Sequence, residues 1–139
     1  MIILDTNVIS AMTAEVPDKT VIGWLDNIRA SEVYTTAVSV FELMVGVERM
    51  NPGRRQDELR TRTDNFLRFL IGSRILPITA DCARAAAALN GRRKLRGITV
   101  DARDTLIAGA CIVSMATLAT GNVRDFADAG IPLINPWAP

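Results

Sequence analysis

The chain has 139 residues, of which 49% are hydrophobic and only 5% aromatic, and its formal net charge is +1. This length predicts one domain, residues 1–139, with a core of aliphatic side chains. Because the chain contains no histidine, histidine-based catalytic triads and zinc sites are excluded, and acid–base or metal chemistry must come from carboxylates.

Strand-like and helix-like segments alternate along the chain. In order, the sequence predicts a strand at 1–4, a short helix from Thr6, a helix at 18–30, a strand at 33–35, helices at 39–50 and 55–71, a strand at 75–78, a helix at 80–90, a basic loop, a helix at 101–115, and strands at 117–120 and 132–134. Pro77 indicates an edge position for its strand. This alternation predicts a mainly parallel sheet wrapped by helices.

Residues 105–123 carry no charge and approach the length of a membrane span. Their polar side chains, and the change from an Ala-rich helix to a strand, favour a buried helix and strand instead. Cys82 and Cys111 lie in Ala-rich helical segments, which is typical of free core thiols in a reducing compartment. Since Asp5 interrupts the N-terminal apolar run, we expect no signal peptide and a cytoplasmic protein.

Acidic residues occur in segments that are otherwise apolar. Asp5 follows the first strand, Glu42 lies within VSVFELMVGV, and Asp104 begins the apolar stretch DTLIAGA. Asn122 and Asp125 follow the strand at 117–120 and are placed to reach the same sheet edge. In open α/β folds, ligands bind at the carboxyl ends of the strands.

Each acid also has a purely structural explanation. Asp5 suits the N-cap of the helix that follows it. Ser39 and Glu42 have the spacing of a capping box, and Asp104 can interact with the dipole of its own helix. Asp125 suits a turn or a cap.

If these acids converge, their mutual repulsion has to be relieved. Two carboxylates about 5 Å apart repel by roughly 3 kcal/mol at an effective dielectric constant of 20. Such a cluster takes up protons or binds a cation, and an all-oxygen ligand set selects Mg²⁺ or Mn²⁺. A hard ion beside basic residues suits phosphodiester hydrolysis by a metal-activated water.

Basic residues are concentrated in two segments. Residues 49–74 contain seven arginines, and RRKLR at 92–96 has four basic residues in five. They form either solvated helix faces with ion pairs or a rim that binds phosphates. The residues predicted for an RNA-binding rim are Arg54, Arg55, Arg92, Arg93, Lys94 and Arg96.

The motifs LDTNVIS, SVFELMVGVERM, DTLIAGA and LATGNVRDF together resemble the PIN-domain ribonucleases. More narrowly, they resemble VapC-type toxins of VapBC toxin–antitoxin pairs, in the FitB-like branch, to which VIGWLD, RILPIT and INPW are also similar. The resemblance implies a three-layer α/β/α sandwich with a mainly parallel sheet. It also implies an endoribonuclease that depends on Mg²⁺ or Mn²⁺.

The resemblance further implies roles for particular residues. Asp5, Glu42 and Asp104 are expected to be the catalytic acids and metal ligands, and Thr6 and Asn7 are expected to hydrogen-bond around Asp5. The family often has a fourth acid where this chain has Asn122, and Asp125 is a candidate for its partial replacement.

The implied partners are a cognate VapB-type antitoxin, an RNA substrate and a second copy of the chain. The homodimer can belong to a larger toxin–antitoxin assembly that binds operator DNA through the antitoxin. A groove between two protomers, rimmed by the two basic segments, would accept single-stranded or looped RNA.

Two other functions are compatible with parts of the sequence. A phosphatase with an aspartate nucleophile usually has a second acid in a D-x-D pattern, but position 7 is Asn. A catalytically weak PIN-like module that binds RNA or a partner is the other alternative, since Asn122 stands in place of an acid.

Overall fold

The structure, a computed structural model describing residues 1–139, contains a five-stranded sheet in the order β3-β2-β1-β4-β5. All four pairings are parallel, as the sequence predicts. The strands are β1 (Ile2–Leu4), β2 (Val33–Thr36), β3 (Ile75–Leu76), β4 (Thr117–Ala119) and β5 (Leu133–Ile134). The predicted edge position of the strand that precedes Pro77 is confirmed, because β3 pairs only with β2.

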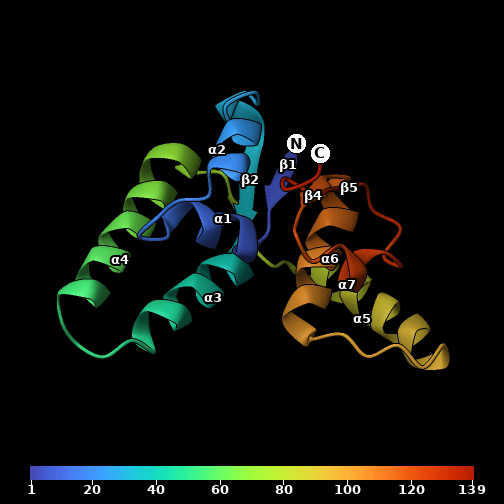
Figure 1. Ribbon diagram of the computed structural model, residues 1–139. Helices are drawn as coiled ribbons and strands as arrows, with labels where there is room; N and C mark the ends of the chain where they lie inside the picture. Colours follow the sequence, from blue (N-terminus) through green and yellow to red (C-terminus); the bar gives the residue numbers. More distant parts are fainter.

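Helices cover both faces of the sheet and complete the three layers (Figure 1). They are α1 (Thr6–Thr13), α2 (Lys19–Leu25), α3 (Ala37–Glu48), α4 (Arg54–Asn65), α5 (Ala80–Leu95), α6 (Ala102–Ser114) and α7 (Val123–Phe126). A 3-10 turn (Ala30–Glu32) precedes β2, and a π-helical turn, η2 (Phe66–Ile71), follows α4. The predicted three-layer α/β/α sandwich is therefore confirmed.

The central strand shows why helices are needed on both faces. Ile3 and Leu4 are both fully buried, and side chains of adjacent strand residues point to opposite faces. Ile3 packs in a core cluster with Leu89 and Ile107 of α5 and α6. Leu4 packs in a second cluster with residues from α1, α2, α3 and η2, such as Val8. The apolar run at the N-terminus therefore joins two cores.

Several predicted boundaries differ from the structure. The helix predicted at 39–50 begins at Ala37, because Thr36 caps it by accepting a hydrogen bond from the Ser39 N–H at 3.1 Å. The predicted Ser39–Glu42 capping box is therefore wrong, and the Glu42 side chain is not used to cap the helix. The amphipathic helix predicted to reach residue 30 ends at Leu25.

The basic segment at 92–96 also differs from its prediction. The helix expected at 80–90 continues to Leu95, so these residues lie mostly in the last turn of α5 rather than in a loop. Arginine and lysine are good helix formers, and the internal Gly91 has open space around it. Arg93 is buried and holds this last turn in place.

The uncharged stretch from residue 105 forms most of α6 and then β4, as expected. No helix is both long enough and apolar enough to cross a membrane. Helix α6 packs very closely on α5, because a Cβ at Gly109 would lie 2.4 Å from the Cys82 carbonyl oxygen. Cys82 and Cys111 are buried free thiols, as predicted.

The C-terminal segment is anchored by Trp137. Its indole Nε1 donates to Asp18 Oδ2 at 2.9 Å, and Asp18 caps the N-terminus of α2. The six-membered ring covers Gly121, where a Cβ would lie 2.7 Å from Cζ3. This contact joins the end of the chain to α2 and to the loop after β4.

Candidate metal centre

Three acids from distant parts of the chain meet at the carboxyl edge of the sheet. One carboxylate oxygen of each of Asp5, Glu42 and Asp104 lies within 4.8 Å of the others. Asp5 follows β1, Glu42 lies in the middle of α3, and Asp104 lies in the first turn of α6. We call these residues the acidic triad. Together with Thr6, Asn7, Ser10 and Asn122, the triad lines an open hollow of about 400 Å³.

Asp5 is the most buried of the three, with 3% of its surface exposed. Its Oδ1 accepts a hydrogen bond from the Thr6 N–H at 2.8 Å, so the residue caps α1 as well as joining the triad. Its Oδ2 accepts from Asn7 Nδ2 at 2.9 Å and from Thr120 Oγ1 at 2.7 Å. Burial raises the pKa of Asp5, and the charge of Glu42 raises it further, although these hydrogen bonds lower it.

Glu42 is oriented by Thr6. The Thr6 hydroxyl donates to Glu42 Oε1 at 2.8 Å, a contact that was not predicted. The hydrogen bonds predicted around Asp5 are present, from the Thr6 backbone N–H and from the Asn7 side chain. Thr6 therefore connects two members of the triad, one through its main chain and one through its side chain.

Asp104 differs from the other two acids of the triad because its carboxylate accepts no hydrogen bond from the protein. The N-cap of its helix, α6, is the nearby Asp101. Burial, followed by the charges of Asp5 and Glu42, raises the pKa of Asp104 to about 6. Its carboxylate is thus both crowded by like charges and free of donors. A cation in the hollow would relieve this repulsion.

Asn122 and Asp125 lie beside the triad but not within it. Asn122 lines the hollow, and its Nδ2 donates to Asp125 Oδ2 at 2.6 Å. The Asp125 charge makes the smallest of the contributions that raise the pKa of Asp104. The Asp125 carboxylate is therefore hydrogen-bonded to Asn122, and it lies beside the acidic triad without belonging to it.

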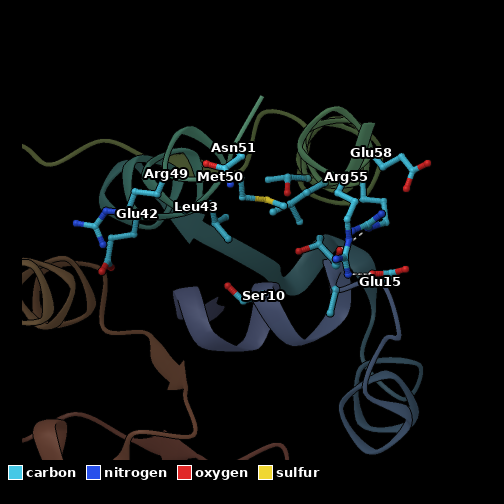
Figure 2. Close-up of a pocket in the computed structure, with 15 residues that line it drawn as sticks. Ser10, Glu15, Glu42, Leu43, Arg49, Met50, Asn51, Arg55 and Glu58 are labelled. Carbon is cyan, nitrogen blue, oxygen red and sulfur yellow. Dashed lines mark hydrogen bonds and ion pairs between the residues drawn. The ribbon is translucent and has the colours of Figure 1, made fainter. Parts of the chain in front are cut away.

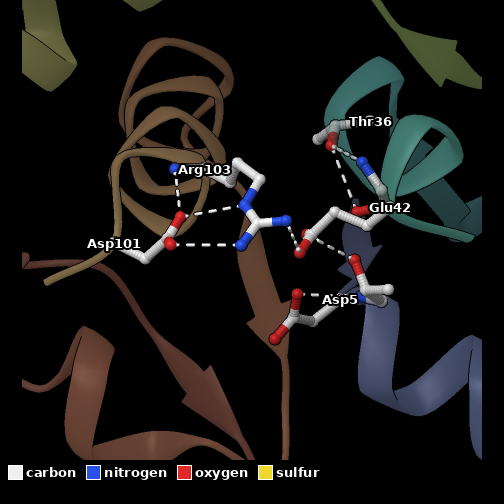
Figure 3. Close-up of polar contacts among 7 residues, drawn as sticks. Asp5, Thr36, Glu42, Asp101 and Arg103 are labelled. Atoms are coloured by element: carbon white, nitrogen blue, oxygen red, sulfur yellow. Dashed lines mark hydrogen bonds and ion pairs between the residues drawn. The ribbon is translucent and has the colours of Figure 1, made fainter. Parts of the chain in front are cut away.

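Two contacts at the site were not expected from the sequence. Thr120 donates to Asp5, and the Arg103 guanidinium Nη1 lies 3.8 Å from Glu42 Oε2. Figure 3 shows Arg103 between the carboxylates of Asp101 and Glu42, with Asp5 nearby. Thr120 follows β4 in the same way that Asp5 follows β1, so its position at a strand end was the available signal.

The basic residues predicted to bind RNA do not form one rim on this chain. The prediction that Arg93 contacts RNA is wrong, because this residue is 1% exposed and its Nε donates to Asp128 Oδ2 at 2.9 Å. Its other nitrogens donate to the Thr105 hydroxyl and the Asp125 carbonyl. The remaining residues are exposed: Arg54 and Arg55 on α4, Arg92 and Lys94 on α5, and Arg96 just after it. Helices α4 and α5 lie on opposite sides of the sheet (Figure 1).

A larger cavity of about 720 Å³ begins beside the triad and extends between α1, α3 and α4. It shares Glu42 and Ser10 with the hollow of the metal centre. Figure 2 shows Glu42 and Arg49 at one end of it, and Arg55, Glu15 and Glu58 at the other. Arg55 donates to Glu15 across the cavity at 3.1 Å. Charged side chains of both signs therefore line this cavity.

The carboxylate oxygens of the triad are suitable ligands for a metal ion. Three carboxylates provide oxygen ligands at mutually compatible distances, and the chain has no histidine to compete for the role. The thiols are not alternatives, since both are buried in the core and burial raises the pKa of Cys111 to about 12. The acidic triad can thus hold a cation.

Comparison with known proteins agrees with this geometry. Residues 2–131 match the family described as PIN domain. The chain is 33% identical to "VapC ribonuclease Y4jK" of Sinorhizobium fredii, over all of this chain and 99% of the relative. It is 34% identical to "Toxin FitB" of Neisseria gonorrhoeae, over 99% of each chain.

Solved structures give the same result. The crystal structure of FitAcB from Neisseria gonorrhoeae has a TM-score of 0.90 and 34% identity, over 99% of both chains. A structure of FitAB bound to an IR36 DNA fragment has a TM-score of 0.91 and 32% identity, over all of this chain and 97% of that one. The fold, the convergence of acids from three elements and these full-length matches lead to one conclusion: the chain belongs to the PIN domain family.

Proposed function

We propose that this protein is an endoribonuclease that depends on Mg²⁺ or Mn²⁺ and acts as the toxin of a toxin–antitoxin pair. The observation that carries the proposal is the convergence of Asp5, Glu42 and Asp104 within 4.8 Å. The names of the relatives, a VapC ribonuclease and a FitB toxin, support both the activity and the toxin role. An all-carboxylate ligand set favours a hard divalent ion over zinc or copper.

The residues of the site have distinct tasks in this proposal. Asp5, fixed by three hydrogen-bond donors, and Asp104, which has none, would be ligands of the ion. Glu42, oriented by Thr6, would be a further ligand or would orient the attacking water. The bound ion would supply a water of lowered pKa and neutralise charge on the phosphate. We expect products with 5′-phosphate and 3′-hydroxyl ends.

The phosphatase alternative is not supported by the hydrogen bonds at the site. Asn7, at the position of the second acid in a D-x-D motif, donates to Asp5 and to Thr120 and accepts from the Gly121 N–H. It has no proton suited to general acid catalysis. Its role is to hold the Asp5 carboxylate in place.

A weakly catalytic binding module remains the second candidate, and one observation favours it. Asn122 stands where the family often has an acid, and it adds no charge to the site. Binding of RNA without turnover, in Mg²⁺ and in Mn²⁺ and after complete removal of the antitoxin, would support this candidate.

The partners in the proposal are an RNA substrate and a VapB-type antitoxin. Similar structures are FitAB and VapBC complexes, and some of them contain DNA. We infer a homodimer that joins a larger assembly on operator DNA through the antitoxin. The cavity beside the triad is a suitable seat for an extended segment of the antitoxin or of the RNA.

The proposal is tested by Mn²⁺ calorimetry and RNA cleavage on the purified toxin. Asp5→Ala and the near-isosteric Asp104→Asn should both abolish Mn²⁺ uptake and cleavage, because each removes an expected ligand. Asp81→Asn is the matched control, since Asp81 is exposed on α5 and pairs only with Arg84. Unaltered cleavage by the triad variants would reject the site.

A further inference from the structure

Arg103 is the only basic side chain within ion-pair distance of the acidic triad. Its Nη1 lies 3.8 Å from Glu42 Oε2. The large cavity is lined by three other arginines, Arg49, Arg55 and Arg62, and none of them forms an ion pair with the triad. Among the basic side chains, Arg103 therefore has the strongest electrostatic interaction with the triad. It would also interact most strongly with any phosphate bound there.

The orientation of the Arg103 guanidinium is fixed by Asp101. Arg103 Nε donates to Asp101 Oδ1 at 3.0 Å, and Nη2 donates to Oδ2 at 3.1 Å. Asp101 is itself held in place, because Oδ1 also accepts from the backbone N–H of Arg103 at 2.8 Å. These two side-chain hydrogen bonds hold the plane of the guanidinium without involving Nη1.

The Nη1 group is the part of Arg103 that faces the site, and it donates no hydrogen bond within the protein. A separation of 3.8 Å from Glu42 is an ion pair but too long for a hydrogen bond. The side chain is 44% exposed, and its partner Glu42 lines the hollow, so a ligand held by the triad would lie close to Nη1. A guanidinium with one edge fixed and the other free is well suited to bind a phosphate oxygen.

Glu42 is a member of the metal centre and also forms the ion pair with Arg103. A divalent ion held by the triad would neutralise the charge of Glu42, and its own positive charge would repel the guanidinium. Arg103 would keep its two hydrogen bonds to Asp101, and Nη1 would be free to bind another anion. In the proposed reaction, the anion nearest to the metal centre is the phosphate of the RNA.

We propose that Arg103 is the phosphate-binding cation of this site, which pairs with Glu42 in the metal-free protein and binds the RNA phosphate once a divalent ion is present. This inference rests on the proposed ribonuclease function. In this inference, Arg103 competes with the metal ion for Glu42 and also contacts the substrate directly. The competition for Glu42 is measurable without any RNA.

The test compares Arg103→Gln and Arg103→Lys with wild type, and uses Arg84→Gln as the matched control. Arg84 forms a similar surface pair with Asp81 on α5, but it contacts no acid of the triad. Calorimetry without RNA measures Mn²⁺ affinity. Single-turnover cleavage of a mixed-sequence, single-stranded RNA at saturating Mn²⁺ measures the contribution to the reaction.

We expect Arg103→Gln to bind Mn²⁺ about two- to fivefold more tightly, because an exposed competing charge is removed. Its cleavage rate should fall by roughly 10²-fold, since a donor to the reacting phosphate is lost. Arg103→Lys should be intermediate in both measurements, and Arg84→Gln should match wild type.

Unchanged cleavage by Arg103→Gln would overturn the phosphate contact, and unchanged Mn²⁺ affinity would overturn the competition for Glu42. Wild-type protein that binds Mn²⁺ but cleaves no RNA would instead reject the proposed ribonuclease function. In that case the Mn²⁺ titration of Arg103→Gln still decides whether this arginine competes for Glu42.

Discussion

At the scale of single residues, the triad combines acids that the protein treats differently. Asp5 is buried but accepts hydrogen bonds from three donors, whereas Asp104 has neighbouring charges and no donor. The protein thus holds one carboxylate rigidly and provides no hydrogen-bond donor for the other. Ionisation of Asp104 beside like charges lowers the free energy of unfolding, so stability depends on pH.

We expect Asp104→Asn to stabilise the metal-free protein at neutral pH. The pKa of Asp104 is raised from 3.8 to about 6, so between these pH values the folded state binds more protons than the unfolded state. The free energy of unfolding of the wild type therefore falls as pH rises through this window. Since Asn does not ionise, the variant avoids a loss of about 1–2 kcal/mol after allowance for solvent screening.

Thermal unfolding in EDTA at several pH values measures this effect. The advantage of Asp104→Asn should be greatest above pH 6 and should vanish as the pH approaches 4. Saturating Mn²⁺ should reverse the order, because about 100-fold excess over the dissociation constant stabilises a binding protein by roughly 2.7 kcal/mol. An advantage that is independent of pH would contradict the assignment of this pKa.

The acids of the triad were predictable because a charge in an apolar segment is conspicuous. Asp5 and Glu42 each interrupt such a segment, and Asp104 begins one. The position of Thr120 at a strand end was a weak signal, and Arg103 gave none, since an arginine at a helix start is ordinary. Only the folded arrangement shows that both contact the triad.

At the scale of elements, the packing of α6 on α5 positions Asp104. Gly109 lies at a close contact between these helices, and Arg93 of α5 bonds to Thr105, the neighbour of Asp104. A change that separates the two helices would therefore act on the metal centre as well as on stability.

We expect Gly109→Ala to destabilise the protein by about 1–3 kcal/mol, because overpacking outweighs the helix propensity gained. Its Cβ would lie 2.4 Å from a backbone oxygen of α5, so the helices have to move. Gly91→Ala in α5 is the matched control and should stabilise by about 0.5–1 kcal/mol, since its Cβ would meet open space. Urea unfolding of both variants measures the difference, and equal effects would contradict the close contact.

Element boundaries were the weakest part of the sequence prediction, for reasons visible in the structure. The helix start at Ala37 depends on Thr36 taking the cap, although Ser39 and Glu42 offered a plausible alternative. The end of α5 depends on the partner of the buried Arg93, namely Asp128, which lies far away in the sequence. Local patterns do not contain this information.

At the scale of the whole molecule, alternating apolar segments were sufficient to predict the layered fold. Ile3 and Leu4 are buried on opposite faces, which requires helices on both sides of a parallel sheet. The strand order and the distribution of charged residues over the surface were not predictable in the same way. In particular, the two basic segments lie on opposite sides of the sheet within one chain, and the predicted rim between two protomers stays a prediction.

We expect exposed cations at the end of α5 to contribute to RNA affinity through phosphates alone. A triple change of Arg92, Lys94 and Arg96 to Gln should weaken binding at low salt and reduce the salt dependence by about 0.7 per charge lost. Fluorescence anisotropy of a labelled single-stranded RNA over a salt series measures both effects. Arg29→Gln is the control, since Arg29 pairs with Glu32 on the surface, and an equal loss there would indicate a non-specific charge effect.

The contact between Trp137 and Asp18 has a practical consequence for expression design. The third residue from the end of the chain holds the cap of α2, so trimming the C-terminus would loosen a helix that begins more than a hundred positions earlier. Fusion partners should follow an intact Pro139 through a flexible spacer, and deletion series should treat the last few residues as part of the folded body.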